Sequence, residues 1–269
     1  MSAYTLSDSS LIVSGHMVLN EPILPAMGYV HFVASSLLNN NDANNADGIY
    51  PMQLKNAVWF SPMTLDKGPC EVNIVFGDED DDKTYWVTSK VPGKATKRHA
   101  TGVVSFDFNA AETNERPVGD QYARSVFPLP DITAQTFTHR LARDDIYRQF
   151  LSAGIDYRGN FQCLHALHCN RTLFWGQICA DEGSLTGLPS PYILDAAIQT
   201  VLLGARKALW GDCPGQVYVP FSLDNILIHK PLTAKCEVFS APRQVSSYSP
   251  DKGVFDVLIV SESGIYWWR

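Results

Sequence analysis

The sequence predicts an α+β fold in which two antiparallel sheets each wrap around a long central helix. Two long apolar segments, residues 25–38 and 191–209, have the pattern of helices buried on most sides. Segments rich in β-branched and aromatic residues accompany both helices, with turn residues between them. A parallel sheet would need a helix between successive strands, and the sequence lacks that alternation. The chain therefore repeats one architecture, with little sequence identity between its halves.

The composition is typical of a soluble globular protein with a large core. The chain has 269 residues, of which 45% are hydrophobic and 18% are charged. Its net charge of −7 argues against nucleic acid or an anionic membrane as the main partner. No apolar run reaches the length of a membrane span, and residues 1–15 lack the pattern of a signal peptide. The six cysteines are scattered along the sequence and form no CxxC motif. We therefore expect free thiols and a cytoplasmic location.

The first half is assigned to residues 1–115 and begins with a strand that leads into a loop, residues 4–19. The first helix starts at Pro25, because proline is favoured at the first helical position. The predicted strands of this half are 57–63, 70–76, 84–89 and 99–108. The acidic run 77–83 lacks the ligand spacing of an EF-hand calcium loop. It is interpreted as a solvated hairpin tip.

Residues 116–140 are broken by prolines and are predicted to be a linker, and residues 141–269 form the second half. A short helix is expected at 144–153, with Ile146, Phe150 and Leu151 on its apolar face. The predicted strands are 161–169, 173–180, 216–221, 226–229, 234–240, 254–260 and 265–269. A strand at the very end suggests a domain of a longer polypeptide.

The second long helix carries an unusual carboxylate. Ser190 is a natural N-cap and Pro191 occupies the first helical position. From there to Leu203 the exceptions to apolar character are Asp195 and Gln199, which share one helix face because they are four residues apart. Burial would raise the pKa of the Asp195 carboxyl and keep it protonated as a proton donor. The alternative is that Asp195 reaches the surface of an amphipathic helix.

His16 lies shortly before the first helix, where a histidine is often structural. If the two halves pack pseudo-symmetrically, however, a residue just before the first helix can face a residue on the second. His16 and Asp195 would then be a base and an acid in one pocket.

Four segments resemble motifs of polyketide synthase dehydratase domains, in the family's order and spacing. Residues 16–25 (HMVLNEPILP) resemble the family's HxxxGxxxxP, and residues 157–162 (YRGNFQ) resemble YGPxFQ. Residues 190–199 (SPYILDAAIQ) are similar to HPxxxDxxxQ, and residues 219–222 (VPFS) are similar to a later "lPfs" strand. The resemblance implies a double-hotdog fold, with His16 from the first hotdog and Asp195 from the second.

The resemblance also implies a reaction. The substrate would be a β-hydroxyacyl thioester on the phosphopantetheine arm of an acyl carrier protein, and the products an α,β-unsaturated thioester and water. His16 would remove the α-proton and Asp195 would protonate the leaving hydroxyl. Gln199 is predicted to hold the carboxyl group or the leaving water, and Tyr157 to lie near the hydroxyl. Pro25 and Phe161 are predicted to line the tunnel. The backbone N–H groups near Met27 and Gly28 are predicted to face the enolate oxygen.

No cofactor of its own and no metal are expected. The expected partners are the carrier protein and neighbouring synthase domains, with a homodimer left open. The docking candidates are two basic groups, Arg140, Arg143 and Arg148 or Lys94, Lys97 and Arg98.

Four positions depart from the family pattern. Asn20 replaces the glycine of the first motif, Ser190 replaces the histidine of HPxxxDxxxQ, and Arg158-Gly159 replaces Gly-Pro. Asparagine tolerates a left-handed backbone, so the turn can persist. The departures leave open a domain specialised for pyran-ring closure or double-bond isomerisation, or an inactive scaffold. A pure isomerase would be expected to have lost the aspartate, and Asp195 is present.

One rival site is the cluster Cys163, His165, His168 and Cys169, which offers four zinc ligands. In a strand, His168 would point away from the other three. A closed tetrahedral site needs all four side chains to converge, so a metal site is not favoured here.

Overall fold

The computed structural model describes residues 2–7, 10–40, 52–65, 69–77, 82–105, 131–184, 187–211, 216–228, 230–243, 253–261 and 264–268. The strands are β1 (Ser2–Leu6), β2 (His16–Val18), β3 (Glu21–Pro22), β4 (Met52–Trp59), β5 (Cys70–Phe76), β6 (Asp82–Lys90), β7 (Lys97–Ser105), β8 (His139–Ala142), β9 (Ile155–Tyr157), β10 (Leu164–Cys169), β11 (Phe174–Cys179), β12 (Ser222–Ile228), β13 (Lys235–Pro242), β14 (Phe255–Ser261) and β15 (Gly264–Trp268). The α-helices are α1 (Leu11–Ser14), α2 (Ala26–Asn40), α4 (Arg143–Ser152) and α5 (Pro191–Ala205).

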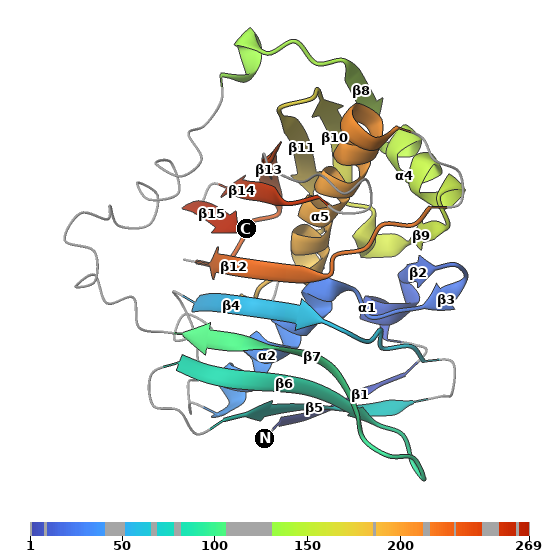
Figure 1. Ribbon diagram of the computed structural model, residues 1–269, viewed down its shortest axis with the longest axis vertical. Coiled ribbons are helices and arrows are strands. Elements are labelled where there is room, and N and C mark those ends of the chain that lie inside the picture. Colours follow the sequence, from blue (N-terminus) through green and yellow to red (C-terminus); the bar gives the residue numbers. More distant parts are fainter. Residues whose placement is uncertain are drawn as a thin grey trace, which may run out of the picture.

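The predicted double-hotdog architecture is confirmed. Each half has a strongly curved antiparallel sheet around one long helix, α2 in the lower half of Figure 1 and α5 in the upper half. The two sheets are joined edge to edge through β4 and β12, in the register Ser222↔Val58 to Ile228↔Met52. They form one twelve-stranded sheet in the order β1-β5-β6-β7-β4-β12-β15-β14-β13-β11-β10-β8. This junction places the open side of each half next to the other, so that α2 packs against α5.

A second, three-stranded sheet has the order β3-β2-β9 and lies on the right of Figure 1. Its central strand β2 comes from the first half and pairs antiparallel with β9 of the second half, with His16 opposite Tyr157. The first half thus contributes a strand that pairs directly with a strand of the second half.

The helix α5 begins as the sequence predicts. Ser190 Oγ accepts a hydrogen bond from the Ile193 N–H at 3.5 Å, and Pro191 follows at the first helical position. Two glycines allow α5 to lie close against β11. A Cβ on Gly204 would lie 2.6 Å from the Phe174 ring, and one on Gly176 would collide with Thr200 Oγ1. Any side chain at either position would push the helix off the sheet.

Several predicted element bounds are wrong. The predicted strand 57–63 is instead β4, which starts five residues earlier, and the segment Gln216–Phe221 is extended without forming a strand. Leu151 is 59% exposed, whereas Ile146 and Phe150 are buried as predicted. Periodicity located these elements, but their ends depend on pairing with distant strands.

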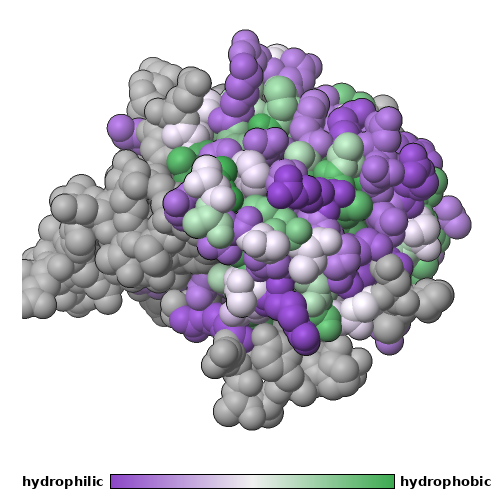
Figure 2. Space-filling view, turned by 90° about the horizontal axis from the view of Figure 1, so that it is seen from above, coloured by the Kyte–Doolittle hydropathy of each residue, from purple (hydrophilic) through white to green (hydrophobic). Residues whose placement is uncertain are grey.

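Several predictions concern residues outside the described part of the chain. They are most of the acidic run 77–83 and residues 116–130 of the predicted linker. Residues 139 and 140, also assigned to that linker, belong to β8, which pairs with β10. None of the described helices is long and apolar enough to span a membrane. On the face that Figure 2 shows, hydrophilic side chains predominate and hydrophobic ones form small separate patches.

Candidate active site

His16 lies in strand β2, not in the loop that the sequence predicts. Its side chain is 8% exposed, and its ring meets the rings of Tyr157 and Phe161 edge-on, with centroids 5.3 and 5.7 Å away. Nδ1 lies 2.9 Å from the carbonyl oxygen of Ile23. A carbonyl can only accept a hydrogen bond, so Nδ1 carries the proton. In the neutral ring this leaves a lone pair on Nε2, which is the state a general base requires.

Asp195 lies on α5 and is buried, 3% exposed, so the alternative of a surface aspartate is wrong. Its Oδ2 accepts a hydrogen bond from Gln199 Nε2 at 3.0 Å. Burial raises the pKa of the Asp195 carboxyl, and this outweighs the lowering by nearby His16 and by the Gln199 hydrogen bond. The carboxyl group therefore holds its proton at pH values where a solvated aspartate has lost it.

The two side chains face a common cavity of about 360 Å³. Its walls come from both halves: His16, Pro25 and Tyr29 on one side, and Tyr157 and Asp195 on the other. The remaining lining is almost entirely apolar, with Val18, Ile23, Leu24, Ala26, Trp59, Phe60, Ser61, Pro62, Ile155, Ile198, Leu202, Tyr218, Val219, Pro220 and Phe221. His16 and Asp195 thus line a cavity that contains little else that is polar.

Gln199 is fixed by contacts that use both ends of its amide. Its Nε2 donates to the Phe161 carbonyl as well as to Asp195, both at 3.0 Å. Its Oε1 lies 3.1 Å from the hydroxyl of Tyr147. That Tyr147 hydroxyl also lies 3.2 Å from the Phe161 carbonyl. The same hydroxyl accepts the Leu164 N–H at 2.8 Å. Gln199 is therefore held as a rigid donor to the carboxyl of Asp195.

Sequence reasoning missed Tyr147. It lies on α4 between Ile146 and Phe150, and apolar periodicity treats it as one more packing residue. The only available signal was that a buried tyrosine hydroxyl normally needs a partner.

Removing the Tyr147 hydroxyl is expected to destabilise the fold. The Tyr147→Phe variant leaves the Leu164 N–H and Gln199 Oε1 without this partner, which costs about 1–3 kcal/mol when the groups are buried. Urea unfolding followed by circular dichroism measures the change. An unchanged midpoint would mean that the hydroxyl has no structural role.

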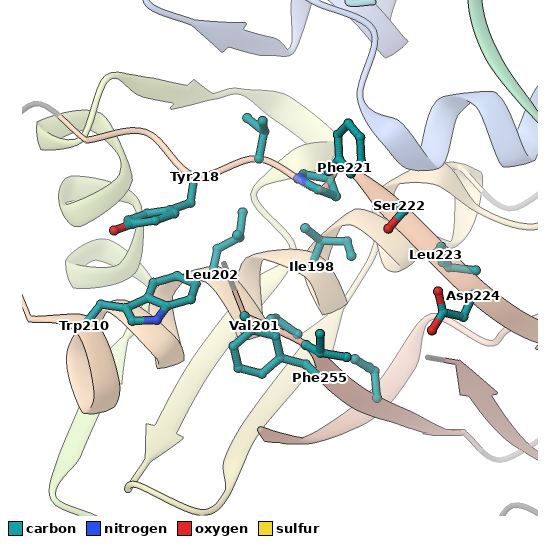
Figure 3. A pocket seen from close by; sticks show the side chains of 15 residues that line it. Ile198, Val201, Leu202, Trp210, Tyr218, Phe221, Ser222, Leu223, Asp224 and Phe255 are labelled. Carbon is teal, nitrogen blue, oxygen red and sulfur yellow. The ribbon is translucent and has the colours of Figure 1, made fainter. Parts of the chain in front are cut away.

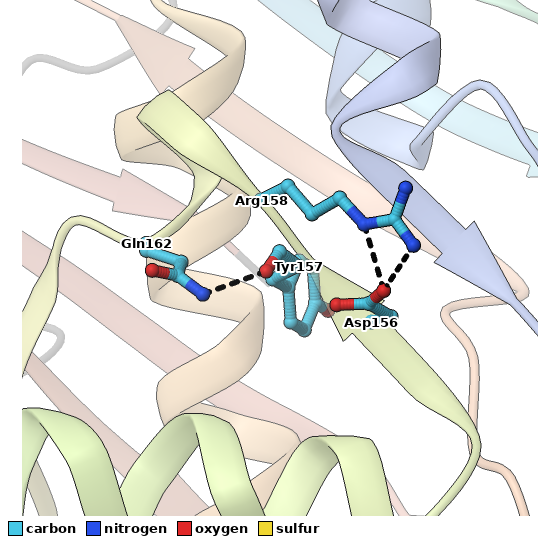
Figure 4. A network of polar contacts seen from close by, with 4 residues as sticks. All are labelled: Asp156, Tyr157, Arg158 and Gln162. Carbon is cyan, nitrogen blue, oxygen red and sulfur yellow. Dashed lines mark hydrogen bonds and ion pairs between the residues drawn. The ribbon is translucent and has the colours of Figure 1, made fainter.

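Tyr157 is buried and lines the cavity beside His16. Burial, together with the nearby Asp195 carboxyl, raises the pKa of its hydroxyl well above the ordinary value, so it stays protonated. Figure 4 shows the polar contacts that hold its backbone: Gln162 Nε2 donates to the Tyr157 carbonyl at 2.8 Å, and Arg158 Nε donates to Asp156 at 2.7 Å. These contacts come from the segment that departs from the family's YGPxFQ pattern.

Two of the departures from the family motifs lie in left-handed backbone. Asn20 has φ 69°, so the left-handed turn expected of a glycine persists, and Leu19 shares this conformation with φ 51°. Gly159 has φ 56°, which a proline at that position would not allow. The Arg158 N–H also donates to the Gly15 carbonyl at 2.8 Å, which ties this turn to the residue before His16.

Three predicted substrate-contacting residues do not line the cavity. Met27 and Phe161 are completely buried in the core, and a Cβ on Gly28 would lie 2.8 Å from the Leu24 side chain. The Gly28 N–H donates to the Pro25 carbonyl at 2.9 Å, so it already has a partner. Of the predicted tunnel residues, the structure brings Pro25 to the cavity wall and uses Phe161 as packing behind His16.

The rival cysteine–histidine cluster does not converge. A bulge in β10 at His165 breaks the alternation, so that His165 is exposed while Cys163 and Cys169 are buried. His168 packs edge-on against the Trp175 ring, with centroids 4.8 Å apart. Within the described residues, no three histidine, cysteine, aspartate or glutamate side chains are grouped as metal ligands would be.

The raised pKa of Asp195 predicts how stability depends on pH. The folded protein holds this proton above the pH at which the unfolded chain releases it, so stability falls as pH rises through that window. We expect Asp195→Asn, which cannot ionise, to gain stability relative to the parent as pH rises from 4 to 8, by about 1.4 kcal/mol per unit of pKa shift. Guanidinium unfolding at pH 4 and at pH 8 measures the difference in the free energy of unfolding between this variant and the parent. A difference independent of pH would contradict the shift.

The fold and the cavity define the class of protein: a double hotdog whose halves contribute one histidine and one aspartate to a shared cavity. The family described as "Polyketide synthase dehydratase N-terminal domain" matches residues 127–265, which is more than half of the sequence. The chain therefore belongs to the polyketide synthase dehydratase family.

Two relatives from Bacillus subtilis (strain 168) are much longer than this chain. Polyketide synthase PksN is 26% identical over 242 residues, which cover 87% of this chain and 4% of PksN. Polyketide synthase PksM is 21% identical over 271 residues, covering 95% of this chain and 6% of PksM. The chain thus matches one small part of large synthases.

Solved structures share the fold. A trans-AT polyketide synthase dehydratase domain from Brevibacillus brevis has a TM-score of 0.80 at 18% identity, covering 98% of this chain and 90% of that one. The dehydratase domain from the CurJ module of curacin polyketide synthase has a TM-score of 0.77 at 14% identity, with coverage of 99% and 90%. A trans-acyltransferase polyketide synthase enoyl-isomerase has a TM-score of 0.72 at 15% identity, with coverage of 99% and 96%.

Proposed function

We propose that this domain removes water from a β-hydroxyacyl thioester carried on an acyl carrier protein within a polyketide synthase. The observation that carries the proposal is that His16 and Asp195, which come from opposite halves of the domain, line one largely apolar cavity. His16 has a free ring nitrogen as base, and Asp195 is a carboxyl whose burial keeps it protonated. An elimination needs both at once.

In this mechanism Nε2 of His16 takes the proton from the α-carbon, next to the thioester carbonyl. The electron pair of the broken C–H bond forms the α,β double bond, and the β-hydroxyl leaves with the proton of Asp195 as water. Gln199 then donates its hydrogen bond to the carboxylate that forms. The Ile23 carbonyl, which accepts the hydrogen bond from Nδ1–H, stabilises the imidazolium.

The carrier protein and the neighbouring domains are the proposed partners. Of the basic residues predicted to dock the carrier, Arg143 already donates to the Gln162 carbonyl and side chain, and Arg148 pairs with Asp145. Lys94 lies in the turn after β6, and Lys97 and Arg98 begin β7. All three are exposed, which favours them as the docking group. Homodimerisation stays a prediction.

Mass spectrometry of the carrier-bound acyl chain tests the function. A β-hydroxyacyl carrier protein is incubated with the domain, and we expect the loss of one water. Loss of water followed by a conversion without mass change that consumes the double bond would instead indicate ring closure. A double bond that moves in an unsaturated substrate, with no water loss from the hydroxyacyl one, would indicate an isomerase. An unchanged substrate would favour the scaffold role.

A further inference from the structure

A second cavity of about 320 Å³ is lined in part by the segment Tyr218–Phe221. Figure 3 shows Ile198, Val201 and Leu202 of α5, and Phe255 of β14, among the residues around it. Its other walls are the ring of Trp210, stacked on Tyr218 with centroids 4.3 Å apart, and the start of β12. None of the residues to which the dehydration mechanism assigns a proton lies in this wall.

The second cavity adjoins the one that holds His16 and Asp195. The two share one continuous wall, which consists of Ile198, Leu202, Tyr218, Val219, Pro220 and Phe221. Helix α5 lines both cavities. Asp195, Ile198 and Leu202 line the first cavity, and Ile198, Val201 and Leu202 line the second. Because α5 lines both cavities, a chain that runs from Asp195 along this helix leads toward the second cavity.

The lining of the second cavity is largely apolar, which favours an alkyl chain as its occupant. Among the described residues that line it, Tyr218, Ser222 and Asp224 are those with a side-chain oxygen, and the others are hydrocarbon apart from the Trp210 indole nitrogen. A phosphopantetheine arm carries two amides, whose burial without hydrogen-bond partners is costly. An alkyl chain has no such need and gains from burial against these walls.

We propose that the second cavity binds the distal, apolar part of the acyl chain, so that Val201 and its neighbours set the chain length that the domain accepts. This proposal rests on the proposed function, because it assumes that the acyl chain is the substrate that reaches Asp195. The substrate class that follows is a β-hydroxyacyl thioester with a long or bulky apolar tail.

The test is a binding measurement that does not depend on turnover. The probes are two non-hydrolysable pantetheine thioethers, one with a 3-hydroxybutyryl-like and one with a 3-hydroxydodecanoyl-like chain. The main variant is Val201→Phe, because Val201 lines the second cavity and not the first. Val254→Trp, at the more exposed rim of the same cavity, is the second variant in case the first fails to fold. Leu151→Trp, on an exposed position outside both cavities, is the control.

We expect the unsubstituted domain to bind the long probe more tightly than the short one. The filled cavity should weaken binding of the long probe by about tenfold or more and leave the short one unchanged, while the control changes neither. Equal weakening of both probes would mean that the cavity holds the pantetheine arm, and no weakening would mean that it is not used. Either result overturns the proposal. Chain-length-dependent binding without water loss would overturn the dehydratase function alone.

Discussion

Replacing either of the two central side chains is expected to stop water loss while the domain stays folded. Asp195→Asn keeps the shape of the carboxyl and its hydrogen bond from Gln199 but cannot give up a proton to the leaving hydroxyl. His16→Ala removes the nitrogen that takes the α-proton. General acid–base groups typically contribute about 10²–10⁴-fold in rate, so each variant should fall by at least that order. Single-turnover mass spectrometry of the carrier-bound chain measures the loss.

A matched control separates chemistry from folding in this experiment. Asp145→Asn makes the same substitution on the exposed face of α4, where Asp145 pairs with the exposed Arg148. We expect unchanged turnover for this variant and a native circular dichroism spectrum for all three. Turnover near the parental rate in Asp195→Asn or His16→Ala would refute the assignment of acid or base.

The largest expected effect on stability comes from Phe161. The side chain is completely buried and contacts the rings of His16, Tyr157 and Tyr192 edge-on or tilted, at centroid distances of 5.7, 6.4 and 4.8 Å. Phe161→Ala leaves a cavity among these rings, and substitutions of this kind cost about 3–5 kcal/mol. Urea unfolding measures the change.

Phe60→Ala is the comparison for this variant, because Phe60 is 49% exposed and should cost much less. If Phe161 instead contacted the substrate, as the sequence predicts, its replacement would raise KM without a comparable loss of stability. A small change in the free energy of unfolding of Phe161→Ala would therefore support the sequence-based prediction that Phe161 lines the substrate tunnel.

The sequence was sufficient to predict the double-hotdog fold, the buried helix with its Ser190 cap, and the position of His16 and Asp195 at one cavity. These features depend on local signals: periodicity, capping residues and motifs at fixed spacing. A buried carboxylate within an apolar helix is conspicuous because its burial is costly without a purpose.

What the sequence could not provide depends on contacts between distant segments. The edge pairing of β4 with β12 turns two sheets into one, and no local pattern encodes which edges meet. The same applies to His16, whose place in a strand follows from pairing with β9. The packing of the two halves also determines the hydrogen bonds of Tyr147. It likewise determines that the cavity wall does not include Met27, Gly28 and Phe161. Sequence spacing alone does not specify this packing.

The central claim is that His16 and Asp195 act on one substrate in one elimination, and a double-mutant cycle tests it most directly. Single-turnover rates of water loss are measured for the parent, His16→Ala, Asp195→Asn and the double variant. Groups that act as a unit give strongly non-additive effects. We predict that the double variant is about as slow as the slower single variant. A double variant slowed by the full product of the two single effects would show that the groups act independently and would contradict the account.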